Sequence, residues 1–222
     1  DILTPEEIHK IEDLSGEYNK FARVIERGNG QKSILRIYDD NMRHPSETEI
    51  TAAFKRMVVK SPMVAFLEGH GERSINGAGD RDYYAFSRYK AFRNSLVNQG
   101  FDNMTLCLDS LDRIPENVDI LVISDVRTPL SEKEQVIIEN YIAQGRNLLI
   151  AGEPRRQEQM NAIIAPLGLA FLPGLLVQES KDYPADLILS KATHAAAGLT
   201  RSFYRMAYYN YCITMPSAVG IE

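Results

Sequence analysis

The chain has 222 residues, of which 44% are hydrophobic and 25% are charged, and its formal net charge at pH 7 is −5. This length suits one α/β domain with or without an appendage, and a core of that size needs neither disulfides nor metal ions to fold. The acidic balance, without a lysine- and arginine-rich face interleaved with aromatic residues, argues against nucleic acid as a partner.

Residues 1–60 are expected to form an appendage that is part of a larger, truncated region. Thr4 precedes Pro5 and two glutamates, which is typical of a helix start. A second helix is expected to start at Ser46, because Glu49 stands at the capping-box position. The other expected features are hairpin strands at 21–26 and 33–38, and a buried stripe of Ile50, Ala53, Phe54 and Met57 on the second helix.

Residues 61–222 are expected to form an α/β domain. Short apolar runs alternate there with helical patterns of roughly ten to fifteen residues, which indicates right-handed crossovers and a parallel sheet between two layers of helices. The expected strands are 63–67, 104–108, 119–126 and 147–153, and the expected helices are 82–100, 131–145 and 155–168.

The pattern loosens after residue 169. Short strands are expected at 170–180 and 184–190. The aromatic-rich segment 201–216 is ambiguous, but the alternation of Tyr209, Tyr211 and Ile213 favours a strand. We therefore expect the aromatic side chains of 203–211 in the core or the sheet, with a surface that binds another chain as the alternative.

The two cysteines, Cys107 and Cys212, match no zinc-site or C-x-x-C spacing. Each lies in an apolar stretch that is expected to be a buried strand. We expect free thiols, although a disulfide between the two stays open and the redox compartment is undecided.

The ends of the chain indicate a piece of a longer protein, because it opens inside a helix motif and stops abruptly at SAVGIE. No apolar run approaches the roughly 18 residues of a membrane-spanning helix. No signal peptide is visible either. Membrane segments of a longer parent protein therefore stay possible.

The expected strand ends carry the candidate binding residues. In an open parallel sheet, ligands bind outside the carboxyl ends of the strands, and here an acid and an arginine follow three of them. These side chains would converge on one rim of the domain and bind a ligand or a partner. The candidates are Glu68, His70, Glu72 and Arg73 after the first strand, Asp125 and Arg127 after the third, and Glu153 and Arg155 after the fourth.

Two kinds of catalytic or cofactor motif are absent from the sequence. The strand-to-helix turn at AGEPRR has Glu153 where a nucleophile elbow would place serine or cysteine, which argues against acyl transfer. The glycine-rich segment 76–80 lacks both the P-loop and the dinucleotide-binding spacing. We therefore predict no catalytic residue and no cofactor.

A metal site is the alternative at the first strand end. Glu68, His70 and Glu72 alternate, so in an extended segment all three side chains would point to one side, as a carboxylate–His–carboxylate set for zinc or a related ion. The favoured interpretation is that the glycines turn the backbone, His70 hydrogen-bonds into the loop, and Glu72 pairs with Arg73 or stays solvated. No metal is predicted.

Three strings occur in order: VAFLEGHGE, LVNQGF, and IPENVDILVISDVRTPLSEKEQVIIENYIAQGRNLLIAGEP. Together they resemble the auxiliary, substrate-binding-like component of gliding-motility-type ABC transporters of Bacteroidetes and other bacteria, over residues 61–178. The resemblance implies a flavodoxin-like fold, similar to class I glutamine amidotransferases without the catalytic cysteine. It also implies a membrane-anchored parent on the periplasmic side of the inner membrane, with permease and ATPase subunits as partners. Arg146 departs from the family, which often has a second glycine there.

The functional hypothesis is a non-enzymatic, extracytoplasmic domain of an ABC-transporter auxiliary protein that binds a partner or ligand at the strand-end rim. One alternative is a metal-dependent or acid/base hydrolase that uses Glu68, His70 and Glu72. The other is a purely structural module between membrane proteins.

Overall fold

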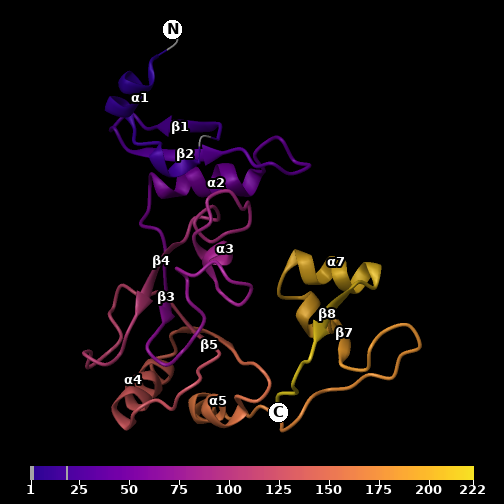
Figure 1. The fold of residues 1–222 in the computed structure, drawn as a ribbon. Helices are drawn as coiled ribbons and strands as arrows, with labels where there is room; N and C mark the ends of the chain where they lie inside the picture. The colour runs from indigo at the N-terminus through magenta and orange to yellow at the C-terminus, as the bar shows by residue number, and fades with distance from the viewer. Residues whose placement is uncertain (1–2, 19) are drawn as a thin grey trace.

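The computed structural model describes residues 3–18 and 20–222 (Figure 1). The chain forms an N-terminal hairpin with helices, a central four-stranded sheet, and a C-terminal arm built on a second hairpin. In the described residues, no helix is both long and apolar enough to cross a membrane. The expected boundary between domains at residue 60 stays a prediction.

The N-terminal unit contains the expected elements. They are α1 (Pro5–Ile11), β1 (Ala22–Glu26), β2 (Lys32–Arg36) and α2 (Glu47–Arg56), and η1 (Ser15–Glu17) is an element that the sequence did not predict. Both helices begin with a capping box, at Thr4 with Glu7 and at Ser46 with Glu49, because each side chain bonds the other residue's backbone N–H. The starts predicted from the sequence are thereby confirmed.

The buried stripe of α2 was predicted only in part. Ala53 and Met57 are buried, but Ile50 and Phe54 are exposed, and Ala52 is buried in their place. Ala52 faces Gly100, where an added side-chain carbon would lie 3.3 Å from the Ala52 methyl group. The close approach of two small residues thus turns the buried face of α2 toward Ala52.

The central sheet has four parallel strands, β3 (Met63–Leu67), β4 (Asp102–Leu106), β5 (Ile120–Ser124) and β6 (Asn147–Ala151), in the order β4-β3-β5-β6. The predicted α/β class with a parallel sheet is confirmed. From β3 the chain continues to β4 at one edge of the sheet. It then crosses to β5, on the other side of β3, and continues to β6 at the opposite edge. The order therefore reverses between β3 and β5, and this is where a parallel sheet leaves a crevice at the strand carboxyl ends.

Each face of the sheet buries alternate strand residues. One face packs Leu67, Leu121 and Ile123 against α4 (Glu132–Ala143) and α5 (Gln157–Ile164). The other face packs Val64, Phe66 and Val122 against Ile75 and the segment that follows it. Both helices lie where the sequence predicted them, and Gly145 ends the first with a positive φ of 67°.

The helix predicted over 82–100 is wrong, because only α3 (Tyr84–Ser87) forms and turns follow it. The Asn98 amide donates to the backbone carbonyls of Lys90 and Phe92, at 3.0 and 2.8 Å. The Leu96 N–H donates back to the Phe86 carbonyl. These bonds close compact turns in place of a helical ladder. The apolar side chains that such a helix would bury are exposed at Phe86, Tyr89 and Phe92 and half-buried at Leu96.

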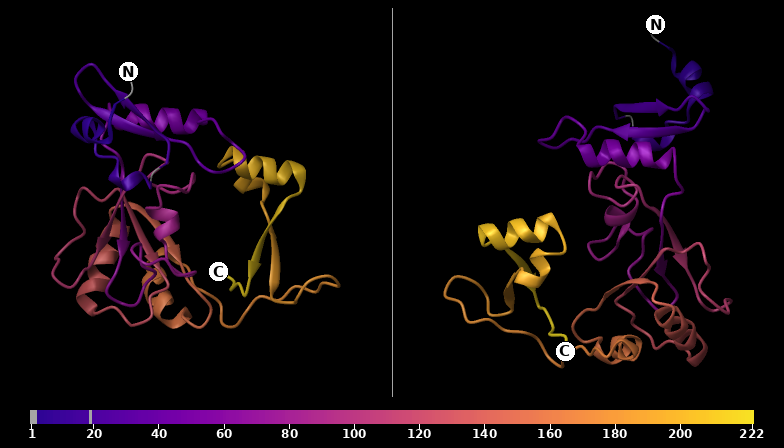
Figure 2. Two further views of the ribbon diagram at one scale, coloured as in Figure 1. Left: turned by 45° about the horizontal axis from the view of Figure 1, so that its top comes forward. Right: turned by 180° about the vertical axis from the view of Figure 1, so that it is seen from behind.

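The C-terminal arm is a long antiparallel ribbon that leaves the central domain after η2 (Ala165–Leu167) (Figure 2). Near its base, residues 170–176 pair with 218–222, through bonds such as Ala170 N–H to the Glu222 carbonyl at 2.9 Å. Further out, β7 (Leu187–Lys191) pairs with β8 (Cys212–Pro216), and α6 (His194–Ala197) and α7 (Arg201–Tyr209) lie between these strands in the chain. The strand predicted at 184–190 is confirmed, whereas 170–180 forms only an irregular ladder and one isolated bridge.

The aromatic segment 203–211 differs from its prediction. It is mostly helical, because the Thr200 side chain accepts from the Phe203 N–H and Asn210 ends the helix in the left-handed conformation, at φ 56°. Its tyrosines are exposed and stand neither in the core nor in a sheet. Both cysteines are free: Cys107 is half-buried just after β4, and Cys212 is exposed, which contradicts its predicted burial.

Candidate functional site

The loop after β3 turns sharply at its glycines. Gly69 has φ +123° and Gly71 has φ +78°, a conformation that disfavours residues with a side chain. A side-chain carbon at Gly71 would also lie 3.2 Å from the Arg127 side chain. The segment is therefore not extended, and the alternation that would place Glu68, His70 and Glu72 on one side does not hold.

His70 holds this loop against the loop after β5. Its carbonyl accepts from the Arg127 and Thr128 N–H groups, at 2.9 and 3.2 Å. Its imidazole, 11% exposed, lies between two carboxylates: Nε2 is 3.3 Å from Glu134 Oε2 and Nδ1 is 3.7 Å from Glu72 Oε1. His70 Nδ1 and Glu72 Oε1 are both buried without a hydrogen-bond partner in the described structure. The arrangement clamps the two loops together across the β3–β5 crevice.

Glu134 belongs to the capping box that starts α4, and it was not among the site residues predicted from the sequence. It is 3% exposed, and its Oε2 accepts from the Ser131 N–H at 2.8 Å and the Ser131 hydroxyl at 2.6 Å. Burial raises the pKa of Glu134, but the Ser131 hydrogen bonds and the His70 ring outweigh that effect, so the pKa lies below its ordinary value. Glu134 thus faces His70 as a carboxylate.

Glu72 is pointed inward and not toward Arg73. Its side chain is 1% exposed, and its Oε2 accepts from the His70 N–H at 2.7 Å. Glu68, by contrast, is exposed at the mouth of the loop. Within residues 3–18 and 20–222, no three His, Cys, Asp or Glu side chains are grouped so as to hold a metal ion.

A cluster of arginines and acids lies beside this loop, which we call the rim cluster: Arg73, Arg81, Asp125, Arg127 and Glu153. Arg73 and Arg81 each bind one carboxylate oxygen of Glu153. Arg81 also lies 3.0 Å from Asp125 Oδ2, and Arg127 lies 3.6 Å from the same atom. The structure thus brings together four of the predicted residues and adds Arg81, which no sequence motif marked.

Asp125 is the buried acid of the rim cluster. Its side chain is 2% exposed, its backbone has φ +55°, and its N–H donates to the Ala151 carbonyl on β6. Its Oδ1 is buried without a hydrogen-bond partner in the described structure. Arg81 is 57% exposed, so one buried acid holds an arginine that reaches into solvent. Such a pair can offer its guanidinium to an incoming anion.

Two cavities flank the rim cluster, and Arg73 lines both. The smaller, of about 270 Å³, lies along the β3 loop and includes Glu68 and Glu72. The larger, of about 1010 Å³, lies between β6 and β8 and includes Arg81, Glu153 and Arg155. Arg155 has φ +69° and makes no ion pair within 4.0 Å among the described residues.

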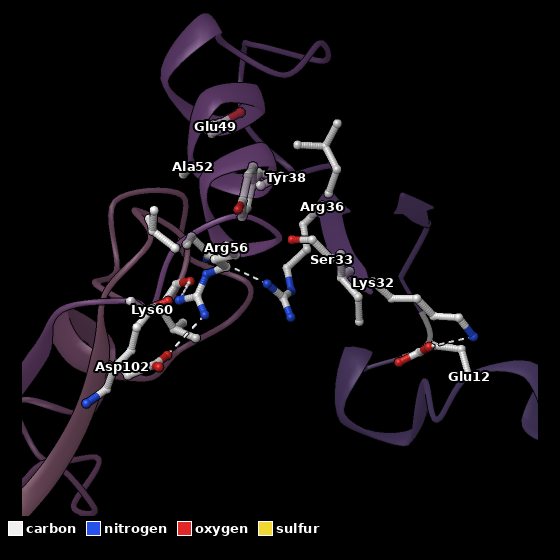
Figure 3. Close-up of a pocket in the computed structure, with 17 residues that line it drawn as sticks. Glu12, Lys32, Ser33, Arg36, Tyr38, Glu49, Ala52, Arg56, Lys60 and Asp102 are labelled. Atoms are coloured by element: carbon white, nitrogen blue, oxygen red, sulfur yellow. Dashed lines mark hydrogen bonds and ion pairs between the residues drawn. The ribbon is translucent and has the colours of Figure 1, made fainter. Parts of the chain in front are cut away.

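A third cavity, of about 480 Å³, lies between the N-terminal unit and the amino ends of β3 and β4 (Figure 3). Its charged side chains are largely paired, with Lys32 3.4 Å from Glu12 and Arg56 3.0 Å from Asp102. It lies away from the strand carboxyl ends and was not predicted from the sequence. The rim is the stronger candidate, because ligands bind outside the carboxyl ends of the strands in an open parallel sheet.

Tyr38 in this third cavity gives a pH prediction. Burial, with Glu49 nearby, raises the pKa of Tyr38 to about 12. The phenol is therefore harder to ionise in the folded chain, so the stability it confers is complete below pH 10 and is lost as the pH rises toward 12. We expect the urea midpoint of the protein to fall more between pH 9 and 11 than that of Tyr38→Phe. Equal falls in both proteins would contradict the assignment.

Comparison with known proteins gives one family match. Residues 61–177, just over half of the chain, match the family described as ABC-type uncharacterized transport system. The comparison with curated proteins found no match. Among solved structures, the one described as mmIFT52 N-terminal domain is 14% identical, with a TM-score of 0.47 over 72% of this chain and 68% of that chain. That score is too low to assign a fold.

Proposed function

The chain belongs to the ABC-type uncharacterized transport system family, a family of transporter auxiliary proteins, and on that basis we propose that it is a non-enzymatic, extracytoplasmic domain that binds a partner or ligand at its strand-end rim. The other components of the ABC transporter, a permease and an ATPase, are the proposed partners. The proposed location is the periplasmic side of the inner membrane, on a membrane-anchored parent protein.

The rim cluster carries this proposal. Asp125 is buried with an oxygen that has no partner among the described residues and holds the exposed Arg81, while Arg155 has no acidic neighbour within ion-pair distance in the same part of the chain. Charged groups in such a crevice are rarely needed for folding, because a buried ion pair adds little net stability compared with apolar packing. The cluster also lies where the strand order reverses, which is the preferred ligand position in parallel sheets.

Finer features of the proposal draw on the order of the strands and on the sequence strings. Counted along the chain from β3, the sheet order is 2-1-3-4, as in flavodoxin-like sheets, and this supports a flavodoxin-like, class I glutamine-amidotransferase-like fold. The strings between residues 61 and 178 support membership of the gliding-motility type found in Bacteroidetes. A hydrolase that uses His70 has weaker support, because the ring is buried between two carboxylates.

Charge reversal at the rim tests the proposal. We expect Arg81→Glu to weaken capture of the permease and ATPase encoded with this protein at least tenfold in co-purification from membranes. The matched control is Arg113→Glu, because Arg113 is also exposed and its only ion pair in the described part of the chain is with Glu116, three residues away. Equal capture by both variants, with unchanged melting temperatures, would remove the rim from the partner interface and leave the purely structural module as the favoured role.

A further inference from the structure

The larger cavity lies between two strands that each have a free edge. Within residues 3–18 and 20–222, β6 pairs only with β5, and β8 pairs only with β7. Ile150 and Ala151 from β6 and residues 213–219 from β8 and the turn after it line the same space. A free strand edge exposes unpaired N–H and C=O groups, which are a template for another strand. We call this space the edge groove.

The register of the arm shows which groups β8 offers. The Leu189 N–H donates to the Gln178 side chain at 2.9 Å and not to β8. Leu189 stands opposite Thr214, so this pair is a non-hydrogen-bonded pair of the antiparallel ladder. The N–H and C=O of Thr214 therefore point to the outer edge, and Thr214 lines the groove. Pro216, two residues on, faces the same way and lacks only a donor.

The hairpin of β7 and β8 gains little stability from packing against the rest of the chain. Every residue of β8 is exposed, and two-stranded hairpins are marginally stable in water without a third strand or a covering helix. The wall of the groove carries the apolar side chains of Phe171, Ile213, Met215 and Ile221. An added strand would cover this wall while it satisfies the free edge.

The charge of the groove lining indicates which kind of peptide strand would bind there. The groove is lined by Arg73, Arg81 and Arg155 and by one acid, Glu153, which pairs with Arg73 and Arg81 and leaves a net positive lining in a chain whose net charge is −5. Arg155 is free of ion pairs within 4.0 Å in the described part of the chain. At about 1010 Å³ the groove also stands at the upper end of the range of small-molecule pockets, and it runs along the length of a strand.

We propose that the edge groove binds an extended acidic peptide segment of a partner protein, which pairs with the outer edge of β8 and places carboxylates on Arg155 and the rim arginines. This mode is strand addition, in which main-chain hydrogen bonds give affinity and side-chain contacts give specificity. The inference deepens the proposed rim function, because it names the chemistry of the bound partner.

A synthetic probe tests the proposal directly. The probe is a fluorescein-labelled octapeptide that alternates valine and glutamate, and its binding is measured by fluorescence anisotropy. We expect saturable binding that weakens at least tenfold with Arg155→Glu but not with the control Arg113→Glu. We expect the valine–lysine counterpart to bind at least tenfold more weakly, because its charge is opposite. We expect the same of a valine–glutamate peptide N-methylated at every residue, because it has no N–H donor on either edge.

Several outcomes overturn the inference. N-methylation without effect would exclude edge pairing, and equal binding of the lysine peptide would exclude charge selection. Displacement of the probe by millimolar glutarate as complete as by excess peptide would show a site for small dicarboxylates. Absence of probe binding, with partner capture still lost in Arg81→Glu, would refute the peptide groove while the rim function stands. Probe binding without any effect of Arg81→Glu on capture would refute the rim function alone.

Discussion

Replacing Arg93 by alanine is expected to lower the free energy of unfolding by about 3–5 kcal/mol, as removal of one partner of a buried ion pair does. The Arg93 guanidinium joins the turns after α3 to the N-terminal unit. It binds both carboxylate oxygens of Asp40, at 2.7 and 2.9 Å, and also the buried Glu49 at the start of α2. It lies 4.6 Å from the centre of the Tyr38 ring as well. Without it, the Glu49 carboxylate stays buried without a cation.

Urea denaturation of the whole chain measures this effect, with Lys55→Ala as the matched control, because Lys55 is exposed on the same helix and makes no ion pair among the described residues. In the double variant with Glu49→Gln, most of the loss should be recovered, since no uncompensated charge then remains. A loss below about 1 kcal/mol for Arg93→Ala would show that the contact behaves as a surface salt bridge.

The elements with local signals were predictable from the sequence. Capping boxes at Thr4, Ser46 and Ser131 mark helix starts through bonds within four residues. The central strands follow from apolar runs that are buried on both faces. The helix expected over 82–100 did not form because Asn98 bonds back to the Lys90 and Phe92 carbonyls and closes turns that its apolar spacing does not reveal. The alternation of Tyr209, Tyr211 and Ile213 favoured a strand wrongly, because these residues span the end of α7 and the start of β8.

The candidate site was predictable where it depends on strand ends. Parallel strands bring their carboxyl ends together, so Arg73, Asp125, Arg127 and Glu153 converge, whereas Glu68, Glu72 and Arg155 do not join them. Arg81 was missed because it belongs to a loop without a motif. Glu134 was missed as the neighbour of His70, although its capping-box position places a carboxylate at the helix start that follows β5. The edge groove depends on how the C-terminal arm folds back, and no local pattern encodes that.

Replacing His70 by alanine is expected to destabilise the chain by about 3 kcal/mol, because the Glu72 and Glu134 carboxylates then stay buried without the ring between them. The loop after β3 also loses a side chain that fixes it against the loop after β5. Thermal and urea unfolding measure the effect. The control is His44→Ala, since His44 is exposed and makes no ion pair in the described residues. His70→Gln, which keeps one donor, should lose less.

This result separates a structural role from a catalytic one. Groups poised for catalysis are held at a cost in stability, so removing them leaves stability unchanged or raises it. Removing a residue that holds two loops together lowers stability instead. Higher stability of His70→Ala would favour the hydrolase alternative, in which the ring between Glu72 and Glu134 is strained for proton transfer. A clear loss identifies the Gly-His-Gly-Glu segment as the support of the rim: it positions the loop from which Arg73 reaches Glu153, and the chemistry of recognition belongs to the arginines.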